Sequence, residues 1–387
     1  MNKSMFVKSL INVIGVALFA FLISRITLFD LTALSYFSPT EKNIDFRSSD
    51  FYQLVADSRQ ERRLDTNIVI VPIDGLSRQE VLTVLEDIYA SSPSVVGLDA
   101  FFPYPSDNDK PLYEFLQSHS NLILPMAVEQ LEEDMYGILP MYLYDSLSTD
   151  RMGVVNMNVV HPYNPVRDFV MKYQTPSGEV YNFAAAISRL ADPEAFEKLQ
   201  KRLADRGECL VDIDFPSWEY TCINPDELLV SSQELEGKVV MVGDISNPQD
   251  FHVTPIGDNV PGVIIHANAI STVLNEGYHS KFPMWGLVIM VVVLCVLFVI
   301  FRTFLFSLGE ADNMVMRIVQ ILMLFMVIWV GTRLYIHHNI ILELSVPLVI
   351  IALVQVALDF WAGFLAAVRW AVSKVASFSE RCKSRKK

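Results

Sequence analysis

Three acidic residues lie where an open α/β sheet would present groups to a ligand. Asp74, Asp99 and Asp244 each stand near the C-terminal end of an apolar run with the composition of a buried parallel strand. Because the carboxyl ends of parallel strands meet at one edge of the sheet, we expect the three carboxylates to share a ligand site. They could orient the donor groups of a polar ligand or hold a divalent cation, although we expect no metal. Alternatively, each acid caps the helix after its strand.

A polar loop and a helix follow the third of these strands. Asp250 and Thr254 lie in the loop, where they could bind a ligand or brace the chain, and the apolar spacing that follows predicts the helix. His266 lies on this helix between apolar residues, so it is either a ligand-binding imidazole or a histidine of the core. His252 is a second imidazole nearby, but its spacing from His266 matches no usual zinc pattern.

Strands and helices alternate through the first part of the domain that carries these residues. Apolar runs predict strands at residues 68–74, 94–102 and 121–128, and helical spacing predicts helices at 79–91 and 111–119. A strand, a helix and a second strand of these lengths form a right-handed βαβ unit. The sequence therefore predicts an α/β domain with a mostly parallel sheet.

Later segments predict departures from this pattern. Residues 153–160 and 166–173 have the alternation of paired antiparallel strands. The acidic stretch 129–150 lacks a clear period and is interpreted as an insertion over the sheet. Residues 181–203 are expected to be helical, with a break at Asp192 and the proline after it.

Cys209 and Cys222 flank a short pattern of alternating residues. Alternation on both sides of residues 214–217 predicts an antiparallel hairpin, and its symmetric register places the two cysteines opposite each other. Directly opposed cysteines lie within reach of a disulfide, and an oxidising compartment would preserve the bond. We therefore expect a disulfide between Cys209 and Cys222. The alternative is two small buried residues that stay reduced.

Long apolar segments predict a four-helix transmembrane region. Residues 9–29 match the roughly 20 residues that cross a bilayer, and they are expected to form an uncleaved anchor rather than a signal peptide. Three C-terminal spans are expected at residues 284–301, 318–336 and 340–361. The expected organisation is a stub and anchor at 1–29, an extracytoplasmic domain at 30–282, three spans at 283–374 and a basic tail at 375–387.

Four charged residues lie in the C-terminal spans, where charges are costly unless they are paired or hydrated. Arg333 and Glu343 lie near the outer ends of adjacent spans, and Arg302 and Asp359 lie near the inner ends of two spans. We expect one ion pair at each interface. Alternatively, each charged side chain extends alone to the nearer interface.

The net charge of −14 is unevenly distributed along the 387 residues. Residues 30–282 contain 39 Asp and Glu against 17 Lys and Arg, a net −22, and the remainder has 5 acids and 13 bases, a net +8. So acidic a domain argues against nucleic acid as a partner. The bases of the C-terminal tail favour cytoplasmic termini, which places the domain outside.

Three motifs, in order and before a membrane span, carry a family resemblance. IVIVPIDGLS at residues 68–77 and VVGLDAFFPYPSDND at 95–109 resemble the opening signature of the second CHASE-type family of extracellular sensory domains, here called CHASE-two. KVVMVGD, D-x-x-x-TP and PGVIIHANAIST, between residues 238 and 272, resemble its closing signature. The resemblance implies an extracytoplasmic α/β sensor domain whose ligand is generally unknown. We expect a multi-pass protein of the bacterial inner membrane, with the large domain in the periplasm or outside.

No sequence motif supports catalysis, and no cofactor is expected. The chain has no nucleophile elbow, P-loop, dinucleotide-binding glycine motif or zinc-protease motif. Relatives of this type carry a kinase or cyclase output domain after the last span, whereas 13 residues follow Lys374 here. We therefore expect a non-enzymatic sensor that binds an unknown envelope ligand or protein and relays this to a separate output protein. The alternative is a structural or assembly subunit of a membrane complex.

Overall fold

The chain folds into two compact units. The computed structural model describes residues 11, 14, 47–59, 63–107, 109–132, 134–144, 147–159, 164–215, 218–307 and 313–384. One unit is Ser49–Ser280, here called the α/β domain. The other comprises Met1–Ser48 and Lys281–Lys387, here called the helical unit.

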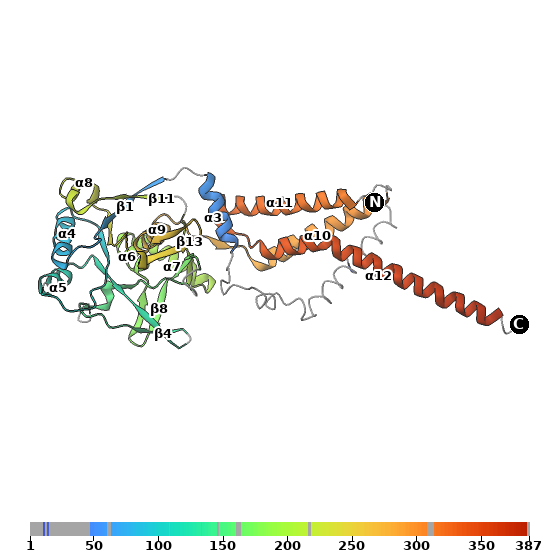
Figure 1. Ribbon diagram of the computed structural model, residues 1–387, viewed down its shortest axis with the longest axis horizontal. Coiled ribbons are helices and arrows are strands. Elements are labelled where there is room, and N and C mark those ends of the chain that lie inside the picture. The colour runs from blue at the N-terminus through green and yellow to red at the C-terminus, as the bar shows by residue number, and fades with distance from the viewer. Residues whose placement is uncertain are drawn as a thin grey trace. The chain divides into compact units, whose positions relative to one another are not determined.

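A six-stranded sheet forms the centre of the α/β domain (Figure 1). The strand order is β11-β1-β12-β2-β3-β6, and every neighbouring pair is parallel, which confirms the predicted parallel sheet. All residues of β3 and β12 are buried, as expected for apolar strands covered on both faces. The strands are β1 (Arg63–Pro72), β2 (Val95–Asp99), β3 (Leu122–Met126), β6 (Met152–Val154), β11 (Trp218–Cys222) and β12 (Val239–Gly243).

Helices cover both faces of this sheet (Figure 1). Alternate residues of β1 enter the two cores: Val69 and Val71 pack with α4 and α5, and Ile68 and Ile70 pack with α6, α7 and α9. The domain therefore has three layers, with helices on either side of the sheet. The helices are α4 (Arg78–Ala90), α5 (Asp109–Ser118), α6 (Phe183–Ala191), α7 (Pro193–Arg206) and α9 (Gly262–Leu274).

Side-chain caps set the ends of these helices. The hydroxyl of Ser77 accepts a hydrogen bond from the Glu80 backbone nitrogen at 3.4 Å, and the Glu80 carboxylate accepts one from the Ser77 nitrogen at 2.7 Å. This capping box satisfies donors that the first turn of α4 leaves open. Asp192 ends α6 and caps α7, so the predicted break in the helix at 181–203 is confirmed.

Short elements surround the central sheet. Within the described part of the domain, antiparallel ribbons form between β4 (Val128–Glu132) and β5 (Met135–Ile138), β7 (Asp168–Val170) and β10 (Leu210–Asp212), β8 (Lys172–Thr175) and β9 (Gly178–Tyr181), and β13 (Phe251–Thr254) and β14 (Gly257–Pro261). The remaining short elements within the described residues are α3 (Ser48–Arg59), α8 (Ser232–Leu235), β15 (Ser280–Lys281), β16 (Ile340–Ile341), and the 3-10 helices η2 (Thr149–Arg151), η3 (Pro225–Glu227) and η4 (Pro248–Asp250).

The predicted hairpin between Cys209 and Cys222 is wrong. β11, which ends at Cys222, pairs in parallel with β1, whereas β10, which follows Cys209, pairs antiparallel with β7. Both cysteines are free and exposed, so the expected disulfide is wrong as well. Alternation of polar and apolar residues indicates that one face of a strand is buried, but it does not identify the strand that pairs with it. Two unrelated strands on either side of a turn therefore imitate a hairpin.

The predicted antiparallel pairing of residues 153–160 with 166–173 is also wrong. β6 joins the central sheet beside β3, and β7 pairs with β10. Gly153 makes the position of β6 possible, because a Cβ there would lie 2.4 Å from the Cα of Phe183 at the start of α6. A strand that passes this close to a helix requires glycine.

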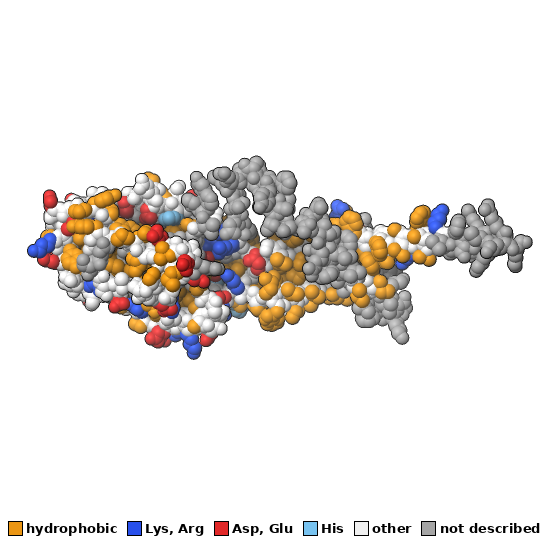
Figure 2. All heavy atoms as spheres, turned by 90° about the horizontal axis from the view of Figure 1, so that it is seen from below, with side chains coloured by type: hydrophobic (Ala, Val, Ile, Leu, Met, Phe, Trp, Pro, Cys, Tyr) orange, Lys and Arg blue, Asp and Glu red, His pale blue; other side chains and the backbone are white. Residues whose placement is uncertain are grey.

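Three long apolar helices make up most of the described helical unit. They contain candidate membrane spans at Met284–Leu305, Met314–His338 and Ser345–Lys374. Figure 2 shows hydrophobic side chains over much of their described surface. The three predicted C-terminal spans are thus confirmed as apolar helices that could cross a membrane. The predicted anchor at 9–29 lies, apart from residues 11 and 14, outside the described residues. The helices are α10 (Met284–Ser307), α11 (Asn313–His338) and α12 (Ser345–Ser384).

The structure brings Arg302 and Asp359 together. Nη2 of Arg302 on α10 lies 2.6 Å from Oδ1 of Asp359 on α12. Gln355, one turn earlier on α12, also donates to the Asp359 carboxylate, at 3.3 Å. These contacts join two of the apolar helices through one carboxylate.

Arg333 and Glu343 have other partners in the described structure. Arg333 on α11 donates to Nε2 of His337 at 2.9 Å, and its guanidinium lies 5.6 Å from the ring centroid of Trp329. Both partners stand one turn away on the same helix, so they engage the guanidinium without Glu343. Glu343 instead accepts a hydrogen bond from Ser48 Oγ at 2.7 Å.

Candidate functional site

A pocket of about 770 Å³ opens in the α/β domain where the parallel strands end. Residues that end or directly follow β1, β2, β3, β6 and β12 contribute to its wall. Open α/β sheets bind ligands at this edge, and the volume suits a small molecule. The polar lining residues are Asp99, Asn156, Asp244, Asn247, Gln249, Asp250, His252 and His266. The larger apolar ones are Ile73, Leu76, Val81, Phe101, Phe102, Val155, Met157 and Val159.

Asp99 is the last residue of β2 and borders the pocket. Burial, together with the negative charge of Asp250, raises the pKa of Asp99 to about 7. Among the residues that the structure describes, none forms a hydrogen bond or ion pair with this carboxyl. Asp99 is therefore an open hydrogen-bonding group that changes charge near neutral pH.

Asp74 and Asp244 are two further carboxyls at this edge, and both bind the loop after β12. Oδ1 of Asp74 accepts hydrogen bonds from the backbone nitrogens of Ile245 and Ser246 at 3.0 and 2.7 Å, and Oδ1 of Asp244 accepts from Ser246 and Asn247 at 2.9 and 3.0 Å. Burial and the contact with Asp74 raise the pKa of Asp244. Burial also acts to raise the pKa of Asp74, but hydrogen bonds from Asp244 and the loop outweigh it and lower that pKa. Together the two carboxylates hold the loop after β12 through its backbone nitrogens.

Asp250 anchors the N-terminus of α9. Its Oδ2 accepts a hydrogen bond from the backbone nitrogen of Gly262, the first residue of that helix, at 3.1 Å. The positive end of the helix dipole favours a carboxylate at this position. A Cβ on Gly262 would lie 2.7 Å from both carboxylate oxygens, so this contact requires glycine. Nε2 of His252 lies 3.6 Å from Oδ1 of Asp250.

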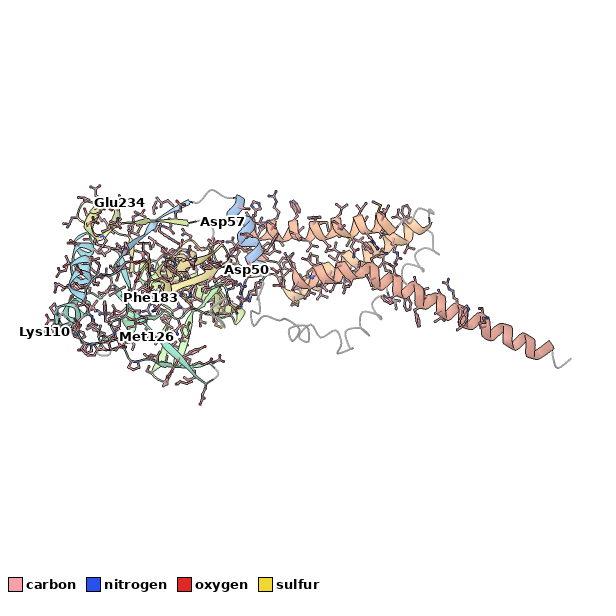
Figure 3. The ribbon with its side chains drawn as sticks, viewed as in Figure 1. Asp50, Asp57, Lys110, Met126, Phe183 and Glu234 are labelled. Carbon is pink, nitrogen blue, oxygen red and sulfur yellow. The ribbon has the colours of Figure 1, made fainter. Side chains whose placement is uncertain are left out.

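His266 on α9 is 4% exposed and borders the pocket. Its ring packs edge-on against Phe183, which Figure 3 labels, at a centroid distance of 5.2 Å. Burial lowers the pKa of His266 to about 4, against the opposing charge of Asp250, so the imidazole is neutral at pH 7. No hydrogen bond within the described part of the chain engages this ring. His266 thus belongs to the core on one side and faces the pocket on the other.

Thr254 has a bracing role outside the pocket lining. Its Oγ1 donates to the carbonyl of Gly257 at 2.9 Å, and the residue is 4% exposed. This bond closes the turn between β13 and β14. The hairpin in turn carries His252 to the pocket.

The segment after β2 forms one wall of the pocket, and two side chains fix it. The hydroxyl of Tyr144 donates to the carbonyl of Ala100 at 2.7 Å. Arg78 forms an ion pair with Asp109, and its guanidinium lies 5.1 Å from the ring centroid of Phe102. The wall that carries Phe102 is therefore held from α4 and from α5.

The structure gathers most of the predicted site residues. Asp99, Asp244, Asp250 and His266 line one pocket, and Asp74 binds the same loop as Asp244, because both carboxylates accept a hydrogen bond from the Ser246 nitrogen. Within the described residues, no group of three or more His, Cys, Asp or Glu side chains is arranged to hold a metal ion. The arrangement suits recognition of an organic ligand through hydrogen bonds and charge.

Sequence analysis missed the contribution of residues 155–159. Asn156 lines the pocket and exchanges two hydrogen bonds with the backbone of Val128, at 2.8 and 2.9 Å. Met157 and Val159 add apolar surface beside it. The sequence predicted that this segment belongs to an antiparallel pair, and it was therefore not expected at the site. The close approach of Gly153 on β6 to Phe183 on α6 leaves no distinctive pattern in the sequence.

These features define a protein in which an α/β domain with a ligand-sized pocket is followed by helices that could cross a membrane. The chain belongs to the CHASE2 domain family, whose model matches residues 19–301, and the CHASE-two resemblance is confirmed. CHASE2 domains are sensory extracellular domains, which is consistent with a membrane sensor. Comparison with the curated proteins and with the solved structures found no match.

Proposed function

We propose that this chain is a membrane sensor that binds a small ligand in its pocket and relays the binding event to a separate output protein. The family supports the sensory role, and the apolar helices support attachment to a membrane. The proposed location is the bacterial inner membrane, with the α/β domain in the periplasm and the termini in the cytoplasm. The net −22 of residues 30–282 against +8 elsewhere supports this orientation and argues against nucleic acid as a partner.

A pocket with open polar groups is the observation that carries this proposal. Asp99 and His266 border the pocket without hydrogen-bond partners among the described residues. A ligand could therefore add hydrogen bonds to both side chains, and this is why the pocket supports a binding function.

Contacts within the domain support a relay from the pocket to α3. β13 carries His252 to the pocket, and the carbonyl of the next residue, Val253, accepts a hydrogen bond from the Val166 nitrogen at 2.8 Å. Arg167 follows directly and binds Asp50 on α3, which Figure 3 labels, with N···O distances of 2.6 and 2.7 Å. The chain enters the domain through α3, so a shift of β13 would reach that helix through adjacent residues.

We propose that the pocket binds its ligand without catalysis. Its described lining has no Ser, Thr, Cys or Lys that a neighbouring histidine could activate as a nucleophile. The output chemistry would then belong to a partner protein.

A thermal-shift screen of the full chain in detergent tests the proposal. The wild type is compared with Ala127→Trp, which places an indole in the pocket, and with Leu229→Trp at a position that is 73% exposed. A ligand stabilises the state that it binds, so at least one compound should raise the midpoint of the wild type and Leu229→Trp but not of Ala127→Trp. Equal shifts in all three proteins, or none in a broad library, would reject the sensor and favour the assembly subunit.

A further inference from the structure

The pocket is acidic and lacks compensating positive side chains. Asp99, Asp244 and Asp250 line it, whereas no Lys or Arg does so in the described part of the chain. A cleft with this charge attracts cations and disfavours phosphates and carboxylates. Asp244 accepts hydrogen bonds from the backbone nitrogens of Ser246 and Asn247, and Asp250 is engaged at the start of α9. Asp99 therefore remains as the carboxyl available to a ligand.

Two hydrogen-bond acceptors in the pocket are open. One is Asp99, and the other is His266, which is more than nine-tenths buried and has no hydrogen bond among the described residues. The neutral imidazole of His266 offers one acceptor nitrogen. A primary ammonium has three donors and no acceptor, so its hydrogen-bonding groups match these two acceptors, whereas an alcohol has a single donor.

Apolar side chains form the rest of the wall. Phe101, Met157 and Val159 lie in it, and burying apolar ligand surface there would contribute about 25 cal/mol per Å². A bare metal ion would leave this surface unused, and the described residues contain no set of three metal-ligating side chains. The wall therefore favours a ligand with an apolar body as well as a polar head.

We infer that the pocket binds a small organic amine, with its ammonium group on Asp99 and His266 and its apolar body against Phe101 and Met157. The inference rests on the sensor function proposed above and adds the chemical class of the ligand. Binding is non-covalent.

Three probes that share a phenyl ring and differ in charge test the inference. 2-Phenylethylamine, 2-phenylethanol and phenylacetate are each added to the full chain in detergent at about pH 8, where Asp99 is mostly ionised. The amine should raise the unfolding midpoint most, the alcohol little and phenylacetate not at all. Isothermal titration of the same samples gives the dissociation constants.

Variants locate the ammonium. Asp99→Asn keeps the shape of the side chain but removes its charge, so it should weaken amine binding about tenfold or more. Asp258→Asn, at an exposed position on β14 outside the lining, is the matched control and should bind like the wild type. His266→Gln should weaken binding less, because the carboxylate remains. Unfolding midpoints without probe show whether each variant is folded.

Equal shifts with the three probes, a larger shift with phenylacetate, or full amine binding by Asp99→Asn would each overturn the amine inference. No shift with the amine would overturn it as well. A non-amine compound whose effect disappears in Ala127→Trp would leave the sensor function standing and reject the amine, so the two proposals fail separately.

Discussion

Arg167 binds Asp50 through two parallel hydrogen bonds. Nε lies 2.6 Å from Oδ1 and Nη2 lies 2.7 Å from Oδ2, and the Arg167 side chain is 4% exposed. This two-point geometry is the strongest form of an arginine–carboxylate contact. Asp50 belongs to α3, and Arg167 directly precedes β7, so one ion pair joins segments 117 residues apart. It fixes α3 to the rest of the domain.

Substituting Arg167 should therefore destabilise the α/β domain strongly. Arg167→Ala deprives a largely buried Asp50 of this partner, and we expect a loss of about 3–5 kcal/mol in the free energy of unfolding. Denaturant titration of the full chain measures it. Lys172→Ala is the matched control, because the Lys172–Glu179 pair is exposed and should contribute at most about 1 kcal/mol. Similar losses in the two variants would show that the buried pair does not secure α3.

Gly262→Ala should disrupt the start of α9. The new methyl group would lie 2.7 Å from the Asp250 carboxylate, which must then move away from the helix terminus. We expect a loss of roughly 2–3 kcal/mol and a lower unfolding midpoint. Gly257→Ala in the preceding β13–β14 hairpin meets no atom within 4 Å and should unfold close to the wild-type temperature. Indistinguishable midpoints for the two variants would contradict the close contact.

Asp99 should make stability depend on pH in a defined direction. Its pKa in the folded protein is about 7, against an ordinary value of 3.8, so the folded state keeps the proton to higher pH than the unfolded state. Its contribution is complete below about pH 4 and is lost as pH rises through 7. The free energy of unfolding of the wild type, minus that of Asp99→Asn, should fall by up to about 4 kcal/mol between about pH 4 and pH 7.

The comparison with a variant is needed because neighbouring groups titrate in the same range. His266 acts in the opposite direction: its pKa is lowered from 6.5 to about 4, so its contribution to stability grows as pH rises between those values. Other titratable groups around Asp99 are Asp74, Tyr144, Asp244, Asp250 and His252. Asp258→Asn, at an exposed position outside the pocket lining, is measured alongside as the control. A flat difference for Asp99→Asn would mean that Asp99 ionises as an ordinary aspartate.

The proposed topology predicts the behaviour of reporter fusions. Fusions after Glu310 and at Lys387 should report a cytoplasmic location, because basic segments stay on that side, and a fusion after Ser106 should be exported. Alkaline phosphatase and fluorescent protein activities distinguish the two sides. An exported reporter at Lys387 would change the number of spans.

The sequence could define the residues that the strand ends contribute to the site. Apolar runs that close on Asp74, Asp99 and Asp244 have one physical interpretation, because strands buried on both faces are continuous apolar runs and parallel strands end at one edge. The structure places Asp99 and Asp244 in the pocket at that edge. The parallel sheet and the C-terminal apolar helices followed from the same kind of local evidence.

The sequence could not define which strands pair with each other in the sheet. The alternation before Cys222 is present, but the residues beside it belong to β1 and not to the segment after Cys209. Strand alternation fixes the buried face and leaves the neighbour open. The expected contact of Arg333 with Glu343 is not formed in the described structure for a related reason. Local spacing does not show that Trp329 and His337 on the same helix engage the Arg333 side chain instead.

Amide hydrogen exchange of the full chain tests the central claim most directly. Exchange is compared with and without the compound that gives the largest thermal shift, in the wild type and in Arg167→Ala. We predict slower exchange at residues 99–102 and 249–252 in both proteins, and slower exchange through α3 in the wild type alone. Unchanged exchange at residues 99–102 and 249–252 with the compound bound would contradict the account, because the ligand would then lie outside the pocket.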